Sequence, residues 1–336
     1  MRALVTGGGG FLGGHIVRAL LQRGDDVFSF SRSNHTWLEA AGVRQIAGDL
    51  TDRTAVAEAV AGVDVVFHVA GMIGAWGPYE EYRLVNVEGT RNVVEACVDA
   101  TVKALVFTSS PSVVFDGRDF EGVDESLPYC SRYLAPYPRS KAAAERATLA
   151  ADDPAGLRTV ALRPHLVLGE HDGSLTPRVL DRGRAGRLRG ISGPVKKVAI
   201  TWVADAARAH LLAADELLDA ARAGGKPYFI ASGEPLAVGE VFDRILAAGG
   251  LPPVGGKLPR AVALVGATLV EWVWRLLRRT DEPPITRWAV HMMASAHWFD
   301  LSAARRDLGY VPEMTHDEGF EALAQWLAEA GHIRSA

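Results

Sequence analysis

The chain of 336 residues carries a formal net charge of −4, with 48% hydrophobic and 23% charged residues. This balance is ordinary for a globular protein with a sizeable core, in one large or two modest domains. It disfavours a nucleic-acid partner, which would need a broad basic field. The first element, "RALVT" at 2–6, has the apolar character of a buried strand, and the N-terminus shows no secretory signal pattern.

In the first half of the chain, short apolar strands alternate with amphipathic helices. We expect helices at 11–23, at about 78–100 and after Pro136. We expect strands at 2–6, 26–30, 43–47, 63–71, 103–110 and 158–164. Alternation of this length produces βαβ units, so the sequence predicts an α/β fold with a Rossmann-type, doubly wound parallel sheet.

This alternation stops after Pro164. Residues 165–197 are rich in Gly and Arg, a strand and a helix return at 198–217, and a further strand follows at 226–232. From Gly233 onward the pattern is mostly helical. We therefore expect a nucleotide-binding domain at 1–164 plus about 198–232, and a smaller, mostly helical substrate region at 165–197 plus 233–336.

Two helical segments of the second region have clear signals. The apolar stretch 261–279 is interrupted by Glu271 and is too short to span a bilayer, so we expect a buried or interfacial helix. Thr315 and Glu318 have the spacing of a capping box, which predicts the start of the last helix.

A glycine-rich loop, "VTGGGGFLGG" at 5–14, lies between the first strand and the first helix. Gly7 permits the tight turn, Gly10 lets the backbone approach a pyrophosphate, and Gly13 lets the helix pack against the sheet. Phosphates would lie at the helix N-terminus, where free N–H groups and the helix dipole favour anions. In this strand–turn–helix context the loop predicts a dinucleotide cofactor.

The residues after the second strand indicate which dinucleotide is bound. An acid there would accept hydrogen bonds from both ribose hydroxyls of NAD, but the stretch is "FSFSRS", with Ser31 and Arg32. An arginine beside a small hydroxyl suits a 2′-phosphate, so we expect NADP(H) in preference to NAD(H). After the third strand, Asp49 is placed either to accept a bond from the adenine amino group or to cap the helix near Thr51.

A tyrosine and a lysine lie one helical turn apart in "APYPRSKAAAER", residues 135–146. Pro138 suits a first helical turn, so Tyr137 lies at the start of a helix, with Lys141 on the same face. A nearby ammonium favours the phenolate, so such a pair could exchange a proton with a carbonyl or an alcohol. A surface tyrosine beside a solvated lysine is the competing interpretation, and the spacing alone does not decide between them.

Seven motifs in chain order together resemble the extended short-chain dehydrogenase/reductase family. They are TGGGGFLG at 6–13, GDL at 48–50, HVAG at 68–71, NVEGT at 86–90, TSSPSVV at 108–114, YPRSK at 137–141 and RPHLVLG at 163–169. The resemblance covers nearly the whole chain and implies a nicotinamide-dependent oxidoreductase acting on a ketone or secondary alcohol.

The resemblance also implies four catalytic residues. Tyr137 is the proton donor or acceptor, and Lys141 binds the nicotinamide ribose and lowers the pKa of the tyrosine. Ser110 hydrogen-bonds the reacting oxygen, and Asn86 supports the nicotinamide side and a proton relay.

Sequence alone leaves Ser109 and Ser112 as rivals to Ser110. The glycine loop, the strand ends and the resemblance together predict the cofactor contacts. They are Gly7, Gly9, Gly10, Phe11, Leu12, Ser31, Arg32, Asp49, Leu50, Val69, Ala70, Gly71, Thr108, Tyr137, Lys141, Pro164 and Leu166.

Within the family, the resemblance is closest to the 3β-hydroxysteroid dehydrogenase-like members, through TSSPSVV, PPITR at 283–287 and FDLSAARRDLGYVP at 299–312. It implies a lipid-like substrate, and specifically reduction of a 2-alkyl-3-oxoalkanoate to the 2-alkyl-3-hydroxyalkanoate, as in bacterial olefin biosynthesis. The alternatives are a 3β-hydroxysteroid or sterol dehydrogenase, with or without decarboxylation, a nucleotide-sugar epimerase or dehydratase, and a non-catalytic dinucleotide sensor. A sensor would not need Ser110, Tyr137 and Lys141 together.

The apolar segment 258–279 is the predicted wall of a cleft for the alkyl chains. Its apolar side chains are Leu258, Val262, Leu264, Val265, Leu269, Val270, Trp272 and Trp274. Arginines 260, 275, 278 and 279 lie at its two ends, where they could meet a substrate carboxylate or anionic lipid headgroups. A helix that only completes the core is the competing interpretation. The expected ligand is a lipid-like keto or hydroxy acid, and peripheral contact with the inner membrane surface is one expectation for the location.

The cysteines and the family resemblance give weaker indications of the binding partners and the cellular compartment. Cys97 and Cys130 have no metal-ligand spacing, so we expect reduced thiols, no metal site and a cytoplasmic protein. The resemblance implies a homodimer through the helix at 78–100 and the Tyr137 helix, with a complex of pathway enzymes as a further option. Tyr82, Val93, Val94 and Cys97 form either an exposed stripe for that dimer or a sheet-facing one.

Two further features stay open from the sequence. His165 could contact substrate or be a structural histidine. The basic stretch either holds an acidic substrate group or forms a solvated helix face. It comprises Arg178, Arg182, Arg184, Arg187 and Arg189.

Overall fold

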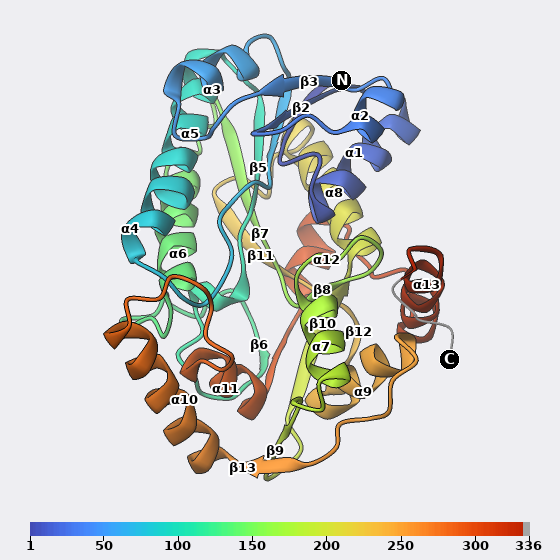
Figure 1. Ribbon diagram of the computed structural model, residues 1–336. Coiled ribbons are helices and arrows are strands. Elements are labelled where there is room, and N and C mark those ends of the chain that lie inside the picture. Colours follow the sequence, from blue (N-terminus) through green and yellow to red (C-terminus); the bar gives the residue numbers. More distant parts are fainter. Residues whose placement is uncertain (332–336) are drawn as a thin grey trace.

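The computed structural model describes residues 1–331, and its centre is a seven-stranded parallel sheet (Figure 1). The strand order is β11-β7-β5-β4-β1-β2-β3. The strands are β1 (Arg2–Thr6), β2 (Asp26–Ser31), β3 (Arg44–Ala47), β4 (Val65–His68), β5 (Ala104–Thr108), β7 (Arg158–Pro164) and β11 (Lys226–Ile230). The order reverses between β1 and β4, which opens a crevice at their carboxyl ends. The predicted Rossmann-type fold is confirmed.

Helices cover both faces of this sheet (Figure 1). One face packs against α3 (Arg53–Val60), α5 (Gly89–Asp99) and α6 (Pro136–Leu149). The other packs against α1 (Phe11–Arg23), α2 (Thr36–Ala40), α8 (Val203–Leu218) and α12 (Ser302–Leu308). Each helix buries one apolar stripe against the nearly continuous apolar strands, as expected for a parallel sheet covered on both sides.

The predicted helix at 78–100 is continuous but changes pitch. It begins as α4 (Tyr79–Tyr82), passes through a π-helical segment, Arg83–Glu88, and continues as α5. Four of its residues, which were candidates for an exposed dimer stripe, are buried inside the chain. They are Tyr82, Val93, Val94 and Cys97. Val93, Val94 and Cys97 therefore face the sheet, whereas the Tyr82 hydroxyl donates to the Trp76 carbonyl at 2.8 Å in the loop after β4.

A second, smaller sheet lies beyond the carboxyl ends of the first. Its order is β12-β10-β14-β6, and β8 (Val167–Leu168) also pairs with β10. The strands are β12 (Ser232–Ala237), β10 (Lys197–Trp202), β14 (His297–Phe299) and β6 (Phe120–Val123). The sequence prediction missed β6, β12 and β14, because such short strands are fixed by long-range pairs, such as His297 with Phe120, and not by local periodicity.

The remaining elements surround this sheet. They are α7 (Leu175–Arg184), α9 (Val238–Ala248), α10 (Arg260–Leu276), α11 (Arg287–Ala294), α13 (His316–Glu329) and the two-stranded sheet of β9 (Gly190–Ser192) and β13 (Lys257–Pro259). The capping box at the start of α13 is confirmed, since Thr315 accepts from the N–H of Glu318 and Glu318 Oε2 accepts from the N–H of Thr315 at 2.9 Å.

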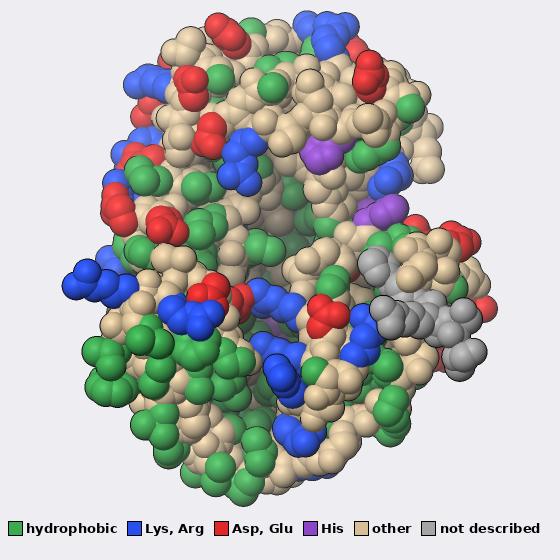
Figure 2. Space-filling view, viewed as in Figure 1, with side chains coloured by type: hydrophobic (Ala, Val, Ile, Leu, Met, Phe, Trp, Pro, Cys, Tyr) green, Lys and Arg blue, Asp and Glu red, His purple; other side chains and the backbone are tan. Residues whose placement is uncertain are grey.

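Helix α10 is oriented differently from the sequence prediction. Its buried residues are Ala263, Ala267 and Glu271, while larger apolar side chains lie on the outside, where Figure 2 shows a broad hydrophobic patch. The exposed set includes Leu258, Val262, Val265, Leu269 and Trp272. Their predicted place in a cleft wall is therefore wrong, because the helix packs through its small residues. Within residues 1–331, no helix has both the length and the apolarity to cross a membrane.

Candidate active site

The glycine loop has the geometry of a phosphate cradle. Gly7 has a φ of 71°, a left-handed conformation, and its N–H donates to the Phe30 carbonyl at 2.8 Å. A methyl group on Gly13 would lie 2.2 Å from the carbonyl oxygen of Gly7, so only glycine lets α1 pack this closely. Gly10 caps α1 without a side-chain hydrogen bond, and the first turn holds no acid. The first N–H groups of α1 therefore suit the pyrophosphate of a dinucleotide.

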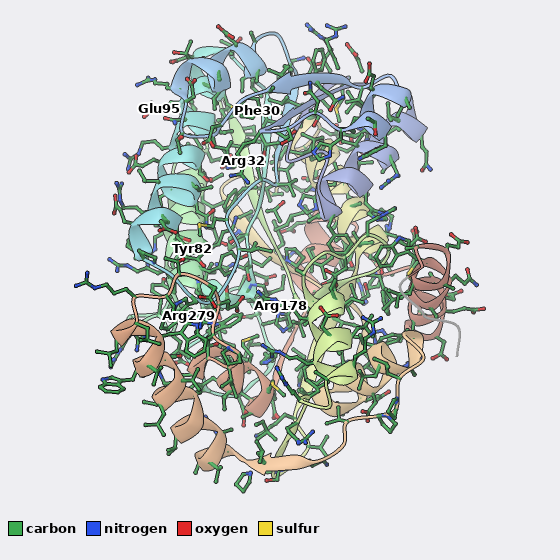
Figure 3. All side chains as sticks on the ribbon, viewed as in Figure 1. Phe30, Arg32, Tyr82, Glu95, Arg178 and Arg279 are labelled. Atoms are coloured by element: carbon green, nitrogen blue, oxygen red, sulfur yellow. The ribbon has the colours of Figure 1, made fainter. Side chains whose placement is uncertain are left out.

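The loop after β2 carries the residues predicted to select the cofactor. Arg32 is exposed at this end of the sheet (Figure 3), and the Ser31 hydroxyl donates to the carbonyl of Ser33 at 2.8 Å. His35 packs against the glycine loop, since a methyl group on Gly9 would lie 2.0 Å from its ring. A positive side chain and a hydroxyl thus lie beside the predicted ribose position.

The loop after β3 gives Asp49 a local role. Its Oδ1 accepts from the N–H of Thr51 at 2.9 Å and from the Thr51 hydroxyl at 2.7 Å, which lowers the pKa of Asp49. The helix cap of α3 is Asp52, so the capping alternative for Asp49 is wrong. The next residue, Leu50, is buried, and its carbonyl accepts from Nδ2 of Asn92 at 2.8 Å.

A buried chain of hydrogen bonds fixes the loop after β4. The Thr6 hydroxyl oxygen accepts from the N–H groups of Val69 and Ala70, both at 3.1 Å, so it donates its own proton to Nδ1 of His68 at 2.9 Å. Nε2 of His68 then donates to the Thr90 hydroxyl at 2.9 Å. Burial lowers the pKa of His68 to about 3, which keeps the ring neutral. Val69 and Ala70 are therefore held beside the glycine loop.

Asn86, in the π-helical segment, joins this loop to the helix of Tyr137. Its Oδ1 accepts from the N–H of Met72 at 2.7 Å, and its Nδ2 donates to the Met72 carbonyl and to the Ser140 hydroxyl, both at 2.9 Å. A methyl group on Gly71 would lie 3.0 Å from Oδ1 of Asn86 and 3.9 Å from Nζ of Lys141. Asn86, Gly71 and Lys141 therefore meet at one point.

Ser110 is the serine that contacts Tyr137. The two side chains share a hydrogen bond, and Ser110 Oγ also accepts from Oγ of Ser112 at 2.9 Å and from its N–H at 3.2 Å. Ser109 is buried, and its N–H donates to the carbonyl of Leu162. The structure thus favours Ser110 over its two rivals, with Ser112 orienting it from behind.

The charges of the Tyr137–Lys141 pair differ from the sequence prediction. Burial raises the pKa of Tyr137 to about 12, against the effect of the Ser110 hydrogen bond, so the phenol is protonated at neutral pH. Burial lowers the pKa of Lys141 to about 7, and the charge of Glu145 opposes that shift. The Lys141 ammonium lies 4.0 Å from the centre of the Phe107 ring. The expected lowering of the tyrosine pKa by Lys141 is therefore absent: burial raises the pKa of Tyr137, and the opposing effect comes from Ser110 and not from the lysine.

Other predicted cofactor residues lie at the same ends of the strands and helices. Phe11 and Leu12 begin α1, and Pro164 ends β7. Leu166 has a φ of 41°, a region that leucine rarely adopts, in the loop after β7. The Thr108 hydroxyl is bonded to Nε2 of a histidine of α8 at 2.8 Å, so this side chain points away from the crevice.

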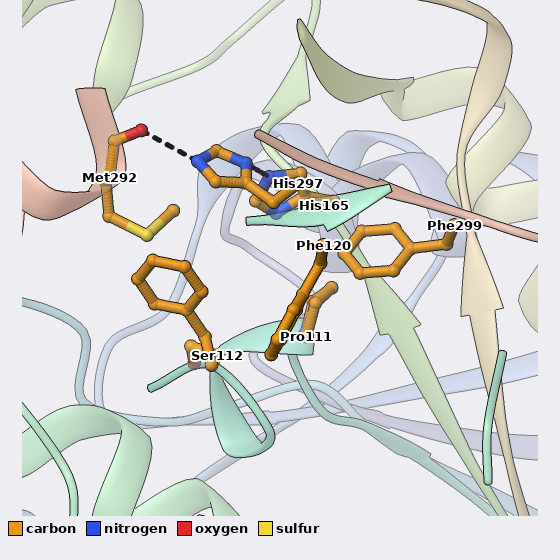
Figure 4. A pocket seen from close by; sticks show the side chains of 8 residues that line it. Pro111, Ser112, Phe120, His165, Met292, His297 and Phe299 are labelled. Atoms are coloured by element: carbon orange, nitrogen blue, oxygen red, sulfur yellow. Dashed lines mark hydrogen bonds between the residues drawn. The ribbon is translucent and has the colours of Figure 1, made fainter. Parts of the chain in front are cut away.

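Sequence reasoning missed a histidine pair at the second sheet. Nε2 of His165 and Nδ1 of His297 are 2.7 Å apart, and Nε2 of His297 donates to the carbonyl of Met292 at 2.7 Å (Figure 4). His165 therefore donates to His297, and burial lowers the pKa of both rings. Ser112 lines the same small cavity. No spacing in the sequence indicates this pair, because His297 comes from a distant strand.

A buried ion pair below Lys141 was also missed. Arg163 donates to Glu145 from Nη2 at 2.5 Å and from Nε at 3.0 Å, and the Tyr129 hydroxyl donates to Glu145 at 2.7 Å. Both charged side chains are buried. Because Glu145 lies one turn after Lys141 on α6, the pair fixes the depth at which the lysine sits.

A larger cavity of about 370 Å³ lies beside the start of α6. Its apolar wall includes Trp76, Leu134, Pro136 and Trp274, and its lining also includes arginines 275, 278 and 279. Of the eight apolar side chains predicted for the cleft, Trp274 alone lines this cavity, together with three of the four arginines predicted at the ends of the segment. Since Pro136 immediately precedes Tyr137, the cavity adjoins the predicted catalytic residues.

The basic stretch of α7 contributes to the same side of the molecule. Arg178 forms an ion pair with Glu282, from the loop between α10 and α11. Arg182 is half-buried one turn further along α7, and burial, with the charge of Arg178, lowers its pKa. The stretch is therefore partly an interior surface, not wholly a solvated helix face.

The fold and this group of side chains define a nicotinamide-dependent oxidoreductase of the extended short-chain dehydrogenase/reductase class. Residues 4–254 match the 3-beta hydroxysteroid dehydrogenase/isomerase family, and the chain belongs to that family.

Individual relatives are similar to the chain over most of its length. The chain is 45% identical to "2-alkyl-3-oxoalkanoate reductase" of Stenotrophomonas maltophilia, over 96% of this chain and 98% of the relative. It is 42% identical to the protein of that name from Shewanella oneidensis, over 96% of this chain and 85% of the relative. A human sterol-4-alpha-carboxylate 3-dehydrogenase (decarboxylating) is 33% identical, over 96% of this chain and 87% of the relative.

Solved structures show the same architecture. Gox2253 superposes with a TM-score of 0.79 at 27% identity, covering 99% of both chains. MoeE5 in complex with UDP-glucose and NAD superposes with a TM-score of 0.74 at 25% identity, covering 98% of this chain and 99% of that one. Family membership and the NAD of this neighbour support a nicotinamide cofactor for the chain.

Proposed function

We propose that this protein uses NADPH to reduce the 3-oxo group of a 2-alkyl-3-oxoalkanoate to the 3-hydroxy group. The observation that carries the proposal is the contact of Tyr137 with Ser110, beside Lys141 and Asn86, at the end of a dinucleotide-binding sheet. The two relatives named for this reaction match over 98% and 85% of their own length, which supports the substrate.

The side chains divide the chemistry as follows. The chemistry that a bound reduced nicotinamide would supply here is the transfer of a hydride to the carbonyl carbon. Tyr137, protonated at neutral pH, gives its proton to the carbonyl oxygen, which becomes the hydroxyl. Ser110 donates a hydrogen bond to the same oxygen, since its lone pairs are occupied by Ser112. Lys141 holds the nicotinamide ribose, and its charge favours the phenolate that remains after proton transfer.

Preference for NADP(H) over NAD(H) is the finer part of this proposal. Arg32 is exposed beside the predicted ribose position and forms no ion pair with another residue within 1–331, so it is available to a 2′-phosphate. In this proposal, Asp49 accepts a hydrogen bond from the adenine amino group. The proposed cofactor contacts are the seventeen residues predicted from the sequence, with Thr108 acting through its backbone.

We propose that the two regions predicted from the sequence bind different molecules. Residues 1–164 and about 198–232 bind the cofactor, although β10 belongs to the second sheet. Residues 165–197 and 233–336 bind the substrate. The cavity of about 370 Å³, with its tryptophans, prolines and arginines, supports a substrate with alkyl chains and a carboxylate.

Assembly and location complete the proposal. We propose a cytoplasmic protein that contacts the inner membrane surface peripherally and forms a homodimer through α5 and α6. Leu84 and Val98 are the large apolar side chains exposed along the helix at 78–100, and they support such a dimer. Light scattering at micromolar concentration tests it, and a stable monomer would reject it. Contact with other enzymes of the pathway is tested by co-purification.

A sterol acid is the second candidate substrate. The human relative is named for a sterol carboxylate, and an apolar cavity beside cationic side chains suits that molecule as well. A nucleotide sugar fits less well. Arginines 275, 278 and 279 could meet its diphosphate, but the apolar wall of Trp76, Leu134, Pro136 and Trp274 offers the sugar hydroxyls only the indole N–H of Trp274, since that of Trp76 already donates to the Arg279 carbonyl.

A substrate panel tests the proposed function. The rate of NADPH and NADH oxidation is measured with 2-alkyl-3-oxo acids of increasing chain length, 3-oxosteroid acids and UDP-sugars. We expect kcat/KM with NADPH to rise steeply with added methylenes until the cavity is full, since each buried CH₂ contributes about 0.8 kcal/mol. Flat efficiency over that series, with turnover of UDP-sugars, would replace the proposal by the epimerase-like alternative.

A further inference from the structure

Helix α10 has its apolar side on the outside. The side that packs on the protein consists of small and polar residues, Ala263, Ala267 and Glu271. Leu269 and Trp272 are each 60% exposed, and Val265 is 61% exposed. Val262, Val273 and Leu276 continue the same exposed surface, which we call the α10 stripe. A soluble surface helix normally shows the reverse arrangement, so this one is built to be covered.

Cationic residues lie at both ends of the α10 stripe. Lys257 and Arg260 precede its first turn, and Arg275, Arg278 and Arg279 end it. Arg275 is paired with buried Glu271, and Arg279 with Asp281. Within residues 1–331, no carboxylate lies at ion-pair distance from Lys257, Arg260 or Arg278; all three are exposed, and Arg260 contacts a histidine instead. The ends of the stripe therefore carry positive charge that the protein leaves uncompensated.

This charge pattern distinguishes between two possible partners. If two copies of α10 packed antiparallel about a two-fold axis, Lys257 and Arg260 of one copy would face Arg278 of the other, and if they packed parallel, each of these cations would face its own counterpart. Like charges so placed are unfavourable. A lipid surface with anionic headgroups would instead pair with both ends while the apolar centre enters the acyl region. No helix within residues 1–331 is long and apolar enough to cross such a surface.

We propose that the α10 stripe docks this protein on an anionic lipid surface, with Leu269 and Trp272 inserted and Lys257, Arg260 and Arg278 at the headgroups. The docking itself does not depend on the reaction.

A consequence for substrate entry does rest on the proposed function. The cavity of about 370 Å³ begins at the C-terminal end of α10, where Trp274 and Arg278 line it, and reaches Pro136, next to Tyr137. An amphiphilic substrate dissolved in the lipid would meet the cavity at its arginines, with its chain already out of water. Docking would therefore shorten the path of a lipid-like acid to the predicted catalytic residues.

Vesicle co-sedimentation of the full chain with NADPH tests the docking without any turnover. The vesicles are pure phosphatidylcholine, or equal parts phosphatidylcholine and phosphatidylglycerol. We expect binding to the anionic vesicles that weakens with added salt. Leu269→Glu should weaken binding by about tenfold or more, because a carboxylate replaces an inserted side chain. Val311→Glu, at an exposed apolar position before α13, is the matched control and should bind as the wild type does.

Further outcomes decide between the alternatives. A blue shift of tryptophan emission on anionic vesicles, lost in Trp272→Phe, supports insertion of the stripe. Failure of the wild type to bind anionic vesicles overturns the proposal, as does unchanged binding by Leu269→Glu. If Leu269→Glu instead converts a dimer to a monomer in light scattering, the stripe belongs to a second copy. Vesicle binding without any 3-oxo acid reduction would refute the proposed function and leave the docking intact.

Discussion

Nδ2 of Asn86 lies 2.9 Å from Oγ of Ser140 and donates a hydrogen bond to it. This contact joins the π-helical segment to α6, three residues from Tyr137 and next to Lys141. The Ser140 hydroxyl donates onward to the Tyr137 carbonyl at 2.8 Å. The predicted catalytic helix is therefore tied at its first turn to the loop that follows β4, so the proposed proton donor and the cofactor loop keep a fixed separation.

Tyr137→Phe removes the proposed proton donor and little else. We expect kcat to fall by about 10²–10⁴-fold, the usual contribution of a positioned general acid, with NADPH affinity and melting temperature nearly unchanged. Steady-state kinetics with the preferred 3-oxo acid, fluorescence titration and thermal unfolding measure the three quantities. Tyr133→Phe is the matched control on the preceding loop. Near wild-type turnover by Tyr137→Phe would remove this residue from the mechanism.

Arg32→Ala tests the basis of NADP(H) preference. A charge-assisted arginine–phosphate bond contributes about 1.5–3 kcal/mol, so NADPH should bind roughly 10–100-fold more weakly and NADH about equally well. Titration of both cofactors measures the change. Arg53→Ala, which loses only an exposed ion pair with Glu95 on α5, should leave both affinities unchanged. Tighter wild-type binding of NADH than of NADPH would refute the assignment.

Lys141→Met should stabilise the cofactor-free protein at low pH. Burial lowers the pKa of Lys141 from 10.5 to about 7, so the folded state penalises the charged form. The cost is complete below pH 7, where the lysine is charged in both states, and disappears as the pH rises to 10.5. At pH 6 we expect the variant to gain several kcal/mol, because each pH unit that separates the folded and unfolded pKa values costs about 1.4 kcal/mol.

Urea unfolding at pH 6 and pH 9 measures this gain. The advantage of Lys141→Met should shrink markedly at pH 9, while turnover is lost at both. Lys103→Met, at an exposed site, should show no such pH dependence. A gain independent of pH would mean that shape, and not charge, limits the fit of the lysine.

Glu145→Gln should destabilise the protein by about 3–5 kcal/mol, because it leaves the Arg163 charge buried without a partner. Replacing both residues by methionine should recover most of that loss, since the pair is then removed together. Denaturant unfolding of Glu145→Met, Arg163→Met and the double methionine variant gives the coupling, and Glu145→Gln is measured in the same way. If Glu145→Gln lowers the free energy of unfolding by less than about 1 kcal/mol, then water or Tyr129 stabilises the buried charge of Arg163 in place of the carboxylate.

Features determined by neighbours in the sequence were predictable. The glycine loop depends on Gly7 and Gly13 being next to β1 and α1, and α6 begins where its prolines allow. The capping box at Thr315 is a local hydrogen-bond pattern as well. These local structures are predictable because they depend on backbone sterics and on hydrogen bonds within the first turn of a helix, and not on the residues that pack around them.

Features set by distant packing were not predictable. The hydrogen bond of His165 to His297 exists because β14 pairs with β10 and β6, and neither histidine has a local signal. The orientation of α10 is a similar case. Its sequence shows two apolar faces, and the small residues Ala263 and Ala267, which permit close packing, decided which one faces inward. The pKa of Tyr137 likewise depends on burial, which the spacing of Tyr137 and Lys141 in the sequence does not predict.

Strand β6 leaves the catalytic half between Ser110 and Tyr137 and forms an edge of the second sheet. The two residues that meet at the proposed reacting oxygen are thus joined by a segment whose fold is completed by β14, near the other end of the sequence. Cutting the chain at residue 164 would leave β6 without its neighbour, so the nucleotide-binding half should not survive as an autonomous fragment. Evolution of a new substrate range through residues around β14 would then alter the catalytic geometry at the same time, which links specificity and rate in this architecture.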